Sequence, residues 1–302
     1  MFELQGHRGA RGLFPENTLP GFRGALAIGV SSLELDIGVT ADDVPVVIHE
    51  PSLDPDLTRD ADGTWLPGSG PPVRALTLDA LRRFDVGRAR PGSATALAFP
   101  QQQPADGAPV PTLAELFALT ARTQVRIDAE LKTDPRAPAA TVPPERMAEL
   151  VVATARACGA LGRLRVRSFD WRGLAWLRRC TPEIPLCWLT SASTEADAAL
   201  WWNCGTAGRP TADMVAAAAA DGPPIRWTPM WAPAHAALSA ASVGEAAARG
   251  LSVVPWTVNA PDDMARLIGW GVHGMCTDRP DLARAEMARA GLPLPPAVIA
   301  DD

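Results

Sequence analysis

The segment Leu33-Glu34-Leu35-Asp36-Ile37 alternates aliphatic side chains with carboxylates. Because successive side chains of a strand point to opposite faces, Glu34 and Asp36 share one face and the aliphatic residues share the other. The aliphatic face predicts a strand packed against helices, so the two carboxylates are expected to face the interior of a barrel. A solvated edge strand with outward acidic residues is the alternative.

Two buried carboxylates side by side repel each other strongly unless a cation lies between them. Oxygen-only ligands favour Mg²⁺ or Ca²⁺ over zinc. Glu130 follows another apolar-rich run and is the natural third carboxylate. The sequence therefore predicts one divalent cation, Mg²⁺ or Ca²⁺, on Glu34, Asp36 and Glu130.

Around this segment, apolar β-branched runs alternate with alanine- and leucine-rich stretches, which predicts a parallel sheet wrapped by helices. Strands are expected at residues 4–6, 33–38, 45–48, 125–131, 164–168, 185–189, 225–228, 251–256 and 273–277. Helices are expected at residues 17–28, 112–121, 144–158, 170–179, 241–249, 261–269 and 281–290. The short link between 33–38 and 45–48 cannot form a parallel crossover, so these runs are antiparallel neighbours or one strand with an excursion. The eight β/α units that remain predict an α/β fold, a TIM (β/α)8 barrel.

Residues 51–110 break this alternation, because they are rich in proline, glycine and aspartate. We expect a small insertion after the second strand, lying over the barrel mouth, with one short helix near 77–84. A second irregular stretch is expected at about 200–224. The chain 1–302 is otherwise predicted to be a single barrel domain.

Composition excludes several classes of protein. The net charge is −6 and no basic run exceeds two residues, which argues against nucleic-acid binding. No apolar run approaches 18 residues, and the chemistry-bearing residues begin at position 7, so we expect neither stable membrane insertion nor a signal peptide. Five cysteines without a CxxC pair indicate reduced thiols. These features predict a cytoplasmic protein.

Two of the four histidines, His7 and His49, each end a short apolar run. Active sites of β/α barrels gather at the carboxyl ends of the strands, so both histidines are expected beside the carboxylates. Histidine titrates nearest neutrality and suits proton transfer. A lone histidine is more often structural, but two in matching positions predict a catalytic pair. His235 and His273 lack such neighbours and are expected to be non-catalytic.

Lys132 is the only lysine in the chain. On a strand, Glu130 and Lys132 project to the same face, about 6.6 Å apart at about 3.3 Å per residue. A surface lysine left by drift is the alternative, but its uniqueness and its spacing from Glu130 favour a functional role. Arg8 could offer a bidentate fork to phosphate oxygens, and Gly9 beside it allows a close approach of the backbone.

Three further residues have a structural and a functional interpretation of similar weight. Asn17 stands at a predicted helix start, where it could cap the helix, contact substrate, or do both. Phe169 and Trp256 follow later strands and could wall the alcohol part of a substrate. Packing in the core explains both aromatic residues nearly as well.

In order and spacing, these motifs resemble those of the glycerophosphodiester phosphodiesterases over about residues 4–286. The matching segments are His7-Arg8-Gly9, Pro15-Glu16-Asn17-Thr18, Glu34-Leu35-Asp36, Val46-Val47-Ile48-His49, Pro111-Thr112-Leu113, Glu130-Leu131-Lys132, Ser168-Phe169, Trp256-Thr257-Val258-Asn259 and Gly271-Val272 through Thr277-Asp278. The resemblance implies a TIM barrel with an insertion, a metal on Glu34, Asp36 and Glu130, a His7/His49 acid–base pair, and substrate contacts from Arg8 and Lys132. Departures from the family pattern are Glu50, His273, a long stretch at 91–109 and the stretch 200–224.

The resemblance also implies metal-dependent hydrolysis of glycerophosphodiesters to sn-glycerol 3-phosphate and an alcohol, with His7 as base and His49 as acid. A lipid-directed, phospholipase D-like enzyme is the first alternative, and it would expose an apolar mouth formed by Trp65, Leu66, Trp201 and Trp202. A non-catalytic phosphodiester-binding barrel is the second, although every candidate ligand is present. The leaving alcohol, the choice between Mg²⁺ and Ca²⁺, the roles of the two histidines and the oligomeric state stay open at this point.

Overall fold

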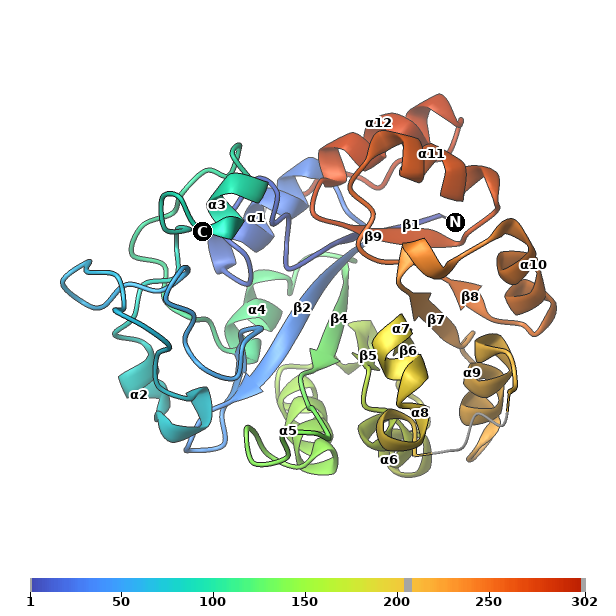
Figure 1. Ribbon diagram of the computed structural model, residues 1–302, viewed down its shortest axis with the longest axis horizontal. Helices are drawn as coiled ribbons and strands as arrows, with labels where there is room; N and C mark the ends of the chain where they lie inside the picture. The colour runs from blue at the N-terminus through green and yellow to red at the C-terminus, as the bar shows by residue number, and fades with distance from the viewer. Residues whose placement is uncertain (1, 204–207, 300–302) are drawn as a thin grey trace.

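The computed structural model describes residues 2–203 and 208–299, and parallel strands form its centre (Figure 1). Their order around the sheet is β8-β7-β6-β5-β4-β2-β1-β9. Backbone hydrogen bonds from His273 N to Val253 O and from Cys276 N to Pro255 O cross the remaining gap, so the barrel is nearly closed. The predicted TIM barrel is confirmed. The parallel strands are β1 (Glu3–Gly6), β2 (Ser32–Val39), β4 (Arg126–Leu131), β5 (Leu164–Ser168), β6 (Leu186–Thr190), β7 (Met230–Pro233), β8 (Ser252–Val253) and β9 (Gly274–Thr277).

Helices surround these strands in Figure 1 and bury their apolar faces against the strands' outward side chains. Helix α4 begins as its sequence predicts, because Thr112 and Glu115 form a reciprocal capping box. No helix among the described residues has the length and apolar character that a membrane crossing requires. The surrounding helices are α1 (Leu19–Ile28), α4 (Leu113–Leu119), α5 (Pro144–Ala157), η2 (Leu161–Arg163), α6 (Trp171–Cys180), α7 (Ala192–Ala196), α8 (Ala198–Trp201), α9 (Thr211–Ala220), η3 (His235–Ala237), α10 (Ala240–Ala248), α11 (Pro261–Gly269) and α12 (Pro280–Arg289).

A ninth strand, β3 (Pro45–Val47), pairs with β2 in antiparallel register, with Val47 opposite Ile37. The backbone N–H of Ile48 then donates to the carbonyl oxygen of Asp36 at 2.9 Å. The antiparallel alternative is therefore the correct one. This antiparallel pairing matters for the site, because it places His49 at the level of Asp36.

The segment between β3 and α4 carries the 3-10 helix η1 (Val73–Ala75) and helices α2 (Leu78–Leu81) and α3 (Ala94–Ala98). It lies on the side of the barrel formed by β2 and α4 (Figure 1). A small core of its own holds it together, made of buried Val46, Leu53, Val73, Leu81 and Val110. The short helix expected near 77–84 is present as α2. Helix α3 was not predicted, although Ser93 caps its first turn.

Two predictions for the second half of the chain are wrong. The expected strand at 225–228 is not formed, and the seventh strand is Met230–Pro233. Trp227 stacks near Trp188 and donates its Nε1–H to the Pro182 carbonyl, which holds this segment outside the barrel. The stretch 200–224, expected to be irregular, includes α9, whose alanine run has high helix propensity. Residues 204–207 within it lie outside the described residues.

Below the mouth, one half of the barrel interior is polar and the other is apolar. Arg165 on β5 pairs with both Glu3 on β1 and Asp128 on β4, and all three side chains are largely buried. The opposite half holds Cys187, Leu189, Met230, Ala232 and Val254. A buried charge needs a partner in this environment, and here the guanidinium of Arg165 pairs with both carboxylates.

Acidification is expected to weaken the fold through Glu3. Burial alone would raise the pKa of this carboxyl, but Arg165 and hydrogen bonds from Gln5 and Ser32 lower the pKa from 4.5 to about 2. A carboxyl with a lowered folded-state pKa stabilises the fold above its unfolded pKa, and this contribution disappears as the pH falls from about 5 toward 2. A shift of this size corresponds to at most about 3 kcal/mol.

Urea unfolding at about pH 7, 5 and 3 measures this contribution. Glu3→Gln lacks the pH-dependent stabilisation that ionised Glu3 provides. Its free energy of unfolding should therefore fall less steeply between about pH 5 and 3 than that of the wild type. Glu149→Gln, which removes an exposed carboxylate on α5, should keep the wild-type slope. Equal slopes for the wild type and Glu3→Gln would contradict the assignment.

Candidate active site

Three carboxylates converge at the carboxyl ends of neighbouring strands. Glu34 and Asp36 lie on β2, and Glu130 lies on β4 directly opposite Asp36 in the parallel register. Each offers an oxygen within 4.8 Å of the others, and all three residues are buried. The alternative of an outward-facing acidic strand is therefore wrong. The alternation read in residues 33–37 places both β2 carboxylates in the barrel, as expected.

The surroundings of Glu34 and Asp36 shift the pKa values of these two carboxyl groups in opposite directions. Burial raises the pKa of Glu34, and the neighbouring Asp36 carboxylate raises it further. Burial acts on Asp36 in the same direction, but the guanidinium of Arg8 and other nearby cations outweigh it and lower the pKa of Asp36 well below its usual range. The three carboxylates offer oxygen ligands, and nearby cations compensate the charge of Glu34 less than that of Asp36. Such a set fits a hard divalent cation such as Mg²⁺ or Ca²⁺.

Arg8 and Asn17 hold two of these carboxylates in place. The backbone N–H of Arg8 donates to Glu34 Oε2 at 3.1 Å, and Arg8 Nε lies 3.1 Å from Asp36 Oδ2. Asn17 Nδ2 donates to Asp36 Oδ2 at 2.9 Å. The guanidinium of Arg8 is further engaged by Glu16, at 2.7 Å. Both residues predicted to bind substrate are thus neighbours of the carboxylate cluster.

The turn after β1 that presents Arg8 depends on glycine. A Cβ at Gly6 would lie 2.1 Å from the Gly9 carbonyl oxygen, which no side chain tolerates. Arg8 and Gly9 have positive φ angles of 49° and 93°. The following helix α1 is capped by Thr18, which accepts from Gly21 N at 3.0 Å. Asn17 is therefore not the helix cap, and its amide is free to hold Asp36.

His7 directly follows β1 and is oriented by a buried aspartate. Its Nδ1 lies 2.6 Å from Asp278 Oδ1, and its Nε2 lies 3.9 Å from Glu34 Oε2. Asn259 fixes this aspartate, because Asn259 Nδ2 donates to Asp278 Oδ2 at 2.7 Å. Burial would raise the pKa of Asp278, but the charge of His7 and its hydrogen bond outweigh that and lower it.

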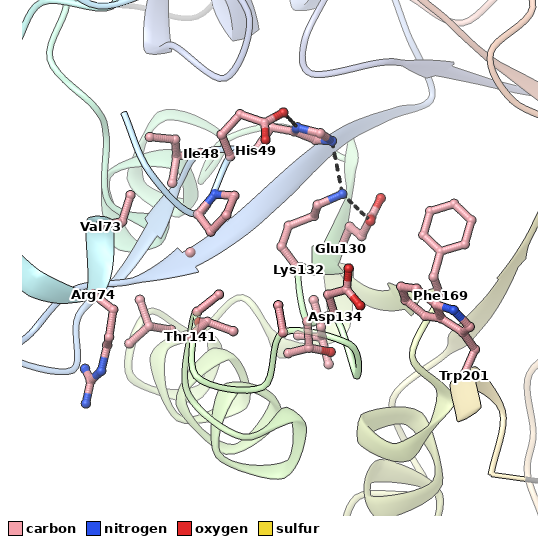
Figure 2. Close-up of a pocket in the computed structure, with 18 residues that line it drawn as sticks. Ile48, His49, Val73, Arg74, Glu130, Lys132, Asp134, Thr141, Phe169 and Trp201 are labelled. Atoms are coloured by element: carbon pink, nitrogen blue, oxygen red, sulfur yellow. Dashed lines mark hydrogen bonds and ion pairs between the residues drawn. The ribbon is translucent and has the colours of Figure 1, made fainter. Parts of the chain in front are cut away.

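His49 has a similar arrangement, with a more exposed partner. Its Nδ1 lies 2.6 Å from Glu50 Oε1, and the hydrogen bond from His49 lowers the pKa of Glu50. Its Nε2 lies 3.1 Å from Lys132 Nζ. Figure 2 shows the ammonium group of Lys132 between His49 and Glu130. Both histidines thus use Nδ1 for a carboxylate and turn Nε2 toward the cluster.

Lys132 extends from the end of β4 into the site. Its Nζ donates to Glu130 Oε1 at 2.8 Å and lies 3.7 Å from Asp36 Oδ1. Burial would lower the pKa of Lys132, but the carboxylates of Glu130 and Asp36 raise it above its ordinary value. The side chain is therefore a cation at neutral pH, placed beside the carboxylates as its spacing from Glu130 predicts.

The two aromatic candidates lie close to each other but have different surroundings. The rings of Phe169 and Trp256 are 5.3 Å apart in an edge-to-face arrangement. Trp256 Nε1 donates to the Ala232 carbonyl, whereas Phe169 lines a cavity beside Lys132. His273, expected to be non-catalytic, accepts a hydrogen bond from Val253 N at its Nδ1.

Asp278 and Glu50, which orient the two histidines, had no role predicted from the sequence. Asp278 directly follows β9, so its position at the carboxyl end of a barrel strand was a usable signal. Glu50 is adjacent to His49 and could have been expected to bind it. Together the residues provide three carboxylates, two oriented imidazoles and one ammonium, a set that suits transfer of a phosphoryl group.

The whole chain was compared with known proteins. It matches the Glycerophosphoryl diester phosphodiesterase family over residues 7–282. A glycerophosphodiester phosphodiesterase of Bacillus subtilis (strain 168) is 28% identical over 286 residues, which cover 91% of this chain and 83% of that protein. A solved structure from Silicibacter pomeroyi DSS-3, assigned to the glycerophosphoryl diester phosphodiesterases, is 35% identical with a TM-score of 0.85, covering 97% of this chain and 95% of its own.

A more distant structure shares the fold. It is an Oleispira antarctica phosphodiesterase in complex with the product sn-glycerol-3-phosphate, 19% identical with a TM-score of 0.66 and covering 95% of this chain and 96% of its own. The family match extends over nearly the whole barrel and includes every site residue described above. The chain therefore belongs to the glycerophosphoryl diester phosphodiesterase family.

Proposed function

We propose that this enzyme hydrolyses glycerophosphodiesters to sn-glycerol 3-phosphate and an alcohol, using a divalent cation and the His7/His49 pair. The observation that carries the proposal is the convergence of Glu34, Asp36 and Glu130 between two oriented histidines. The product bound to the Oleispira antarctica relative supports the glycerol 3-phosphate part. A cytoplasmic location, expected from the sequence, is part of this proposal.

Glu34, Asp36 and Glu130 would hold the cation. A bound Mg²⁺ or Ca²⁺ supplies Lewis-acid stabilisation of charge on the phosphoryl oxygens. Lys132 adds a fixed positive charge on the β4 side of the cluster, where its ammonium can exchange a carboxylate contact for a phosphate oxygen. Arg8 holds the cluster through Glu34 and Asp36, and its guanidinium adds positive charge at the opposite edge.

The histidines move the protons. His7 is assigned as the base, because a buried Asp278 at Nδ1 fixes the ring and stabilises the imidazolium that forms when Nε2 takes a proton. The proton comes from the attacking oxygen. If that oxygen is water, sn-glycerol 3-phosphate forms directly; if it is a glycerol hydroxyl of the substrate, a cyclic phosphodiester forms and a second attack, by water, opens it to sn-glycerol 3-phosphate. His49 is assigned as the acid that protonates the leaving alkoxide, and its Nε2 is free to carry that proton once the ammonium of Lys132 turns from it to a phosphate oxygen.

The positions of the four residues predicted to form an apolar mouth argue against the lipid-directed alternative. Trp201 and Trp202 are 7% and 4% exposed, and Trp202 stacks on Trp171. The guanidinium carbons of Arg59 and Arg90 lie 5.6 and 5.4 Å from the ring centroid of Trp65, and Leu66 packs against the small core of the insertion. These residues do not form an exposed apolar mouth. A non-catalytic barrel is disfavoured by the complete set of carboxylates, histidines and lysine.

Identification of the products tests the reaction. With glycerophosphocholine as substrate, the enzyme should release sn-glycerol 3-phosphate and choline, which an enzymatic assay for each product distinguishes. Release of glycerol and phosphocholine would mean that the other phosphoester bond is cleaved. No release from glycerophosphocholine, glycerophosphoethanolamine or glycerophosphoglycerol would contradict the proposal.

Lys132 offers a prediction about phosphate binding. Lys132→Met keeps the stem but removes the charge, so kcat/KM should fall by about 10²-fold, the usual cost of one preorganised charge contact. Lys132→Arg should also be impaired, because its planar fork does not reproduce a point charge held between Glu130 and His49. Arg83→Met, on an exposed position of the insertion, is the control and should leave the kinetics unchanged. Activity of both Lys132 variants within twofold of the wild type would exclude a phosphate contact.

A further inference from the structure

A cavity of about 320 Å³ opens beside Lys132 (Figure 2). Its size is at the lower end of small-molecule pockets, which are about 300–1,000 Å³. Its walls come from the end of β2, the segment after β3, the insertion, the end of β4 with the loop before α5, the residue that follows β5, and α8. The apolar wall residues include Val39, Ile48, Val73, Ala140, Phe169 and Trp201.

The cavity is continuous with one side of the active site only. His49, Glu130 and Lys132 form its inner edge. His7 and Asp278, on the opposite side of the carboxylate cluster, do not line it. A phosphodiester has two organic arms. The arm that lies beside His49 therefore enters the cavity, and the arm beside His7 does not.

The charged groups at the cavity wall are already paired within the chain. Lys132 pairs with Glu130, and His49 pairs with Glu50. Asp134 is bound by Arg136 in a bidentate contact, with nitrogen–oxygen distances of 3.1 and 2.9 Å. Because these charged groups are already paired, a molecule in the cavity would contact mainly the apolar walls. Two threonines also line the cavity, and the Oγ1 of one of them, Thr133, already donates to Asp170. The walls thus offer few partners for the hydroxyl groups of a glycerol arm, and burying an unpaired hydroxyl is costly.

A quaternary ammonium group is also a poor fit for this cavity. Such groups are recognised by the faces of aromatic rings. The ring of Trp201 is already covered by the chain's own Arg136, whose guanidinium carbon lies 5.0 Å from the ring centroid. The remaining ring, Phe169, is engaged edge-to-face with Trp256. An uncharged aliphatic chain needs no partner other than the apolar walls.

We propose that this cavity receives the leaving alcohol and selects glycerophosphodiesters whose alcohol is an uncharged aliphatic chain of a few carbons. This inference rests on the proposed phosphodiesterase function and adds the class of alcohol to it. Each methylene buried in an apolar site contributes enough to raise kcat/KM by up to about fourfold. Because these contacts lie away from the reacting phosphorus, they should act mainly through KM, with kcat little changed.

The test uses sn-glycerol 3-phosphate esters of ethanol, butanol and hexanol, with glycerophosphocholine as the charged comparison. The wild type should show kcat/KM rising from ethanol to butanol to hexanol by about tenfold per step, and the hexanol ester should exceed glycerophosphocholine. Equal kcat/KM for the three alkyl esters, or a preference for glycerophosphocholine, would overturn the proposal. No hydrolysis of any ester would instead contradict the phosphodiesterase function itself.

Variants on the loop before α5 show whether the cavity causes the preference. Ala140 lines the cavity, whereas its neighbour Ala139 is exposed and does not. Ala140→Phe should abolish the chain-length preference and leave kcat for the ethanol ester unchanged, and Ala139→Phe should behave as the wild type. If Ala140→Phe does not fold, Ala137→Phe fills the cavity from an exposed position on the same loop. A preference retained in a folded filling variant would place the alcohol elsewhere.

Discussion

Replacing His7 by alanine is expected to lower kcat by about 10²–10⁴-fold, the range of a lost general base or acid. The same loss is expected for His49→Ala with natural glycerophosphodiesters. The p-nitrophenyl ester of sn-glycerol 3-phosphate separates the roles of base and acid, because its leaving group, p-nitrophenolate, needs no protonation. With that ester His49→Ala should recover most of its activity, while His7→Ala should stay impaired, as expected if His7 activates the attacking oxygen.

Steady-state kinetics with both substrates measures these effects. His235→Ala is the control, because His235 lies in η3 after β7 and the sequence predicts no catalytic role for it. It should keep wild-type kinetics with both esters. Unfolding midpoints should agree among the three variants. Recovery of His7→Ala rather than His49→Ala would reverse the assignment, and normal activity in either variant would remove that histidine from the mechanism.

Replacing Glu34 by glutamine should change activity and stability in opposite directions. Glu34→Gln removes one of three anionic ligands, so apparent cation affinity and activity should fall by at least about 10²-fold, since loss of outer partners alone costs up to that much. Burial and the Asp36 carboxylate raise the pKa of Glu34 in the folded state. Ionised Glu34 therefore destabilises the metal-free fold above that raised pKa, and the penalty disappears as the pH falls toward its unfolded value.

Thermal unfolding in EDTA and in excess Mg²⁺ or Ca²⁺ tests this prediction. Near neutral pH, metal-free Glu34→Gln should be more stable than the metal-free wild type. Added cation should stabilise the wild type by about 2.7 kcal/mol at a hundredfold excess over Kd, but should have little effect on the variant. Glu149→Gln makes the same charge change at an exposed position of α5, and added cation should stabilise it as much as the wild type. Equal cation stabilisation of wild type and Glu34→Gln would exclude Glu34 as a ligand.

The parts of the site that the sequence predicts are those encoded by strand periodicity. The alternation in residues 33–37 places Glu34 and Asp36 on one face, and the parallel register of β2 and β4 adds Glu130 opposite Asp36. The unique Lys132 reaches the same cluster because its spacing from Glu130 is that of one strand face. Such predictions succeed because the two-residue period of a strand is a local property of the backbone, and because the active sites of such barrels gather at the carboxyl ends of the strands.

Other features depend on contacts between distant parts of the chain. The partner of His7 is Asp278, at the other end of the sequence, and only closure of β1 against β9 brings them together. The amide of Asn17 holds Asp36, although its position beside a helix start is equally typical of a cap. The strand expected at 225–228 failed because Trp227 packs outside the barrel, which depends on Trp188 and not on the local pattern.

Removal of the cation tests the central claim most directly. The release of sn-glycerol 3-phosphate from glycerophosphocholine should be measured before and after treatment with EDTA and dialysis, and again after addition of Mg²⁺ or Ca²⁺. We predict loss of activity on chelation and recovery with one of the two cations in the wild type, but no recovery in Glu34→Gln at the same concentration. Full activity in dialysed enzyme that elemental analysis shows to be metal-free would contradict the account.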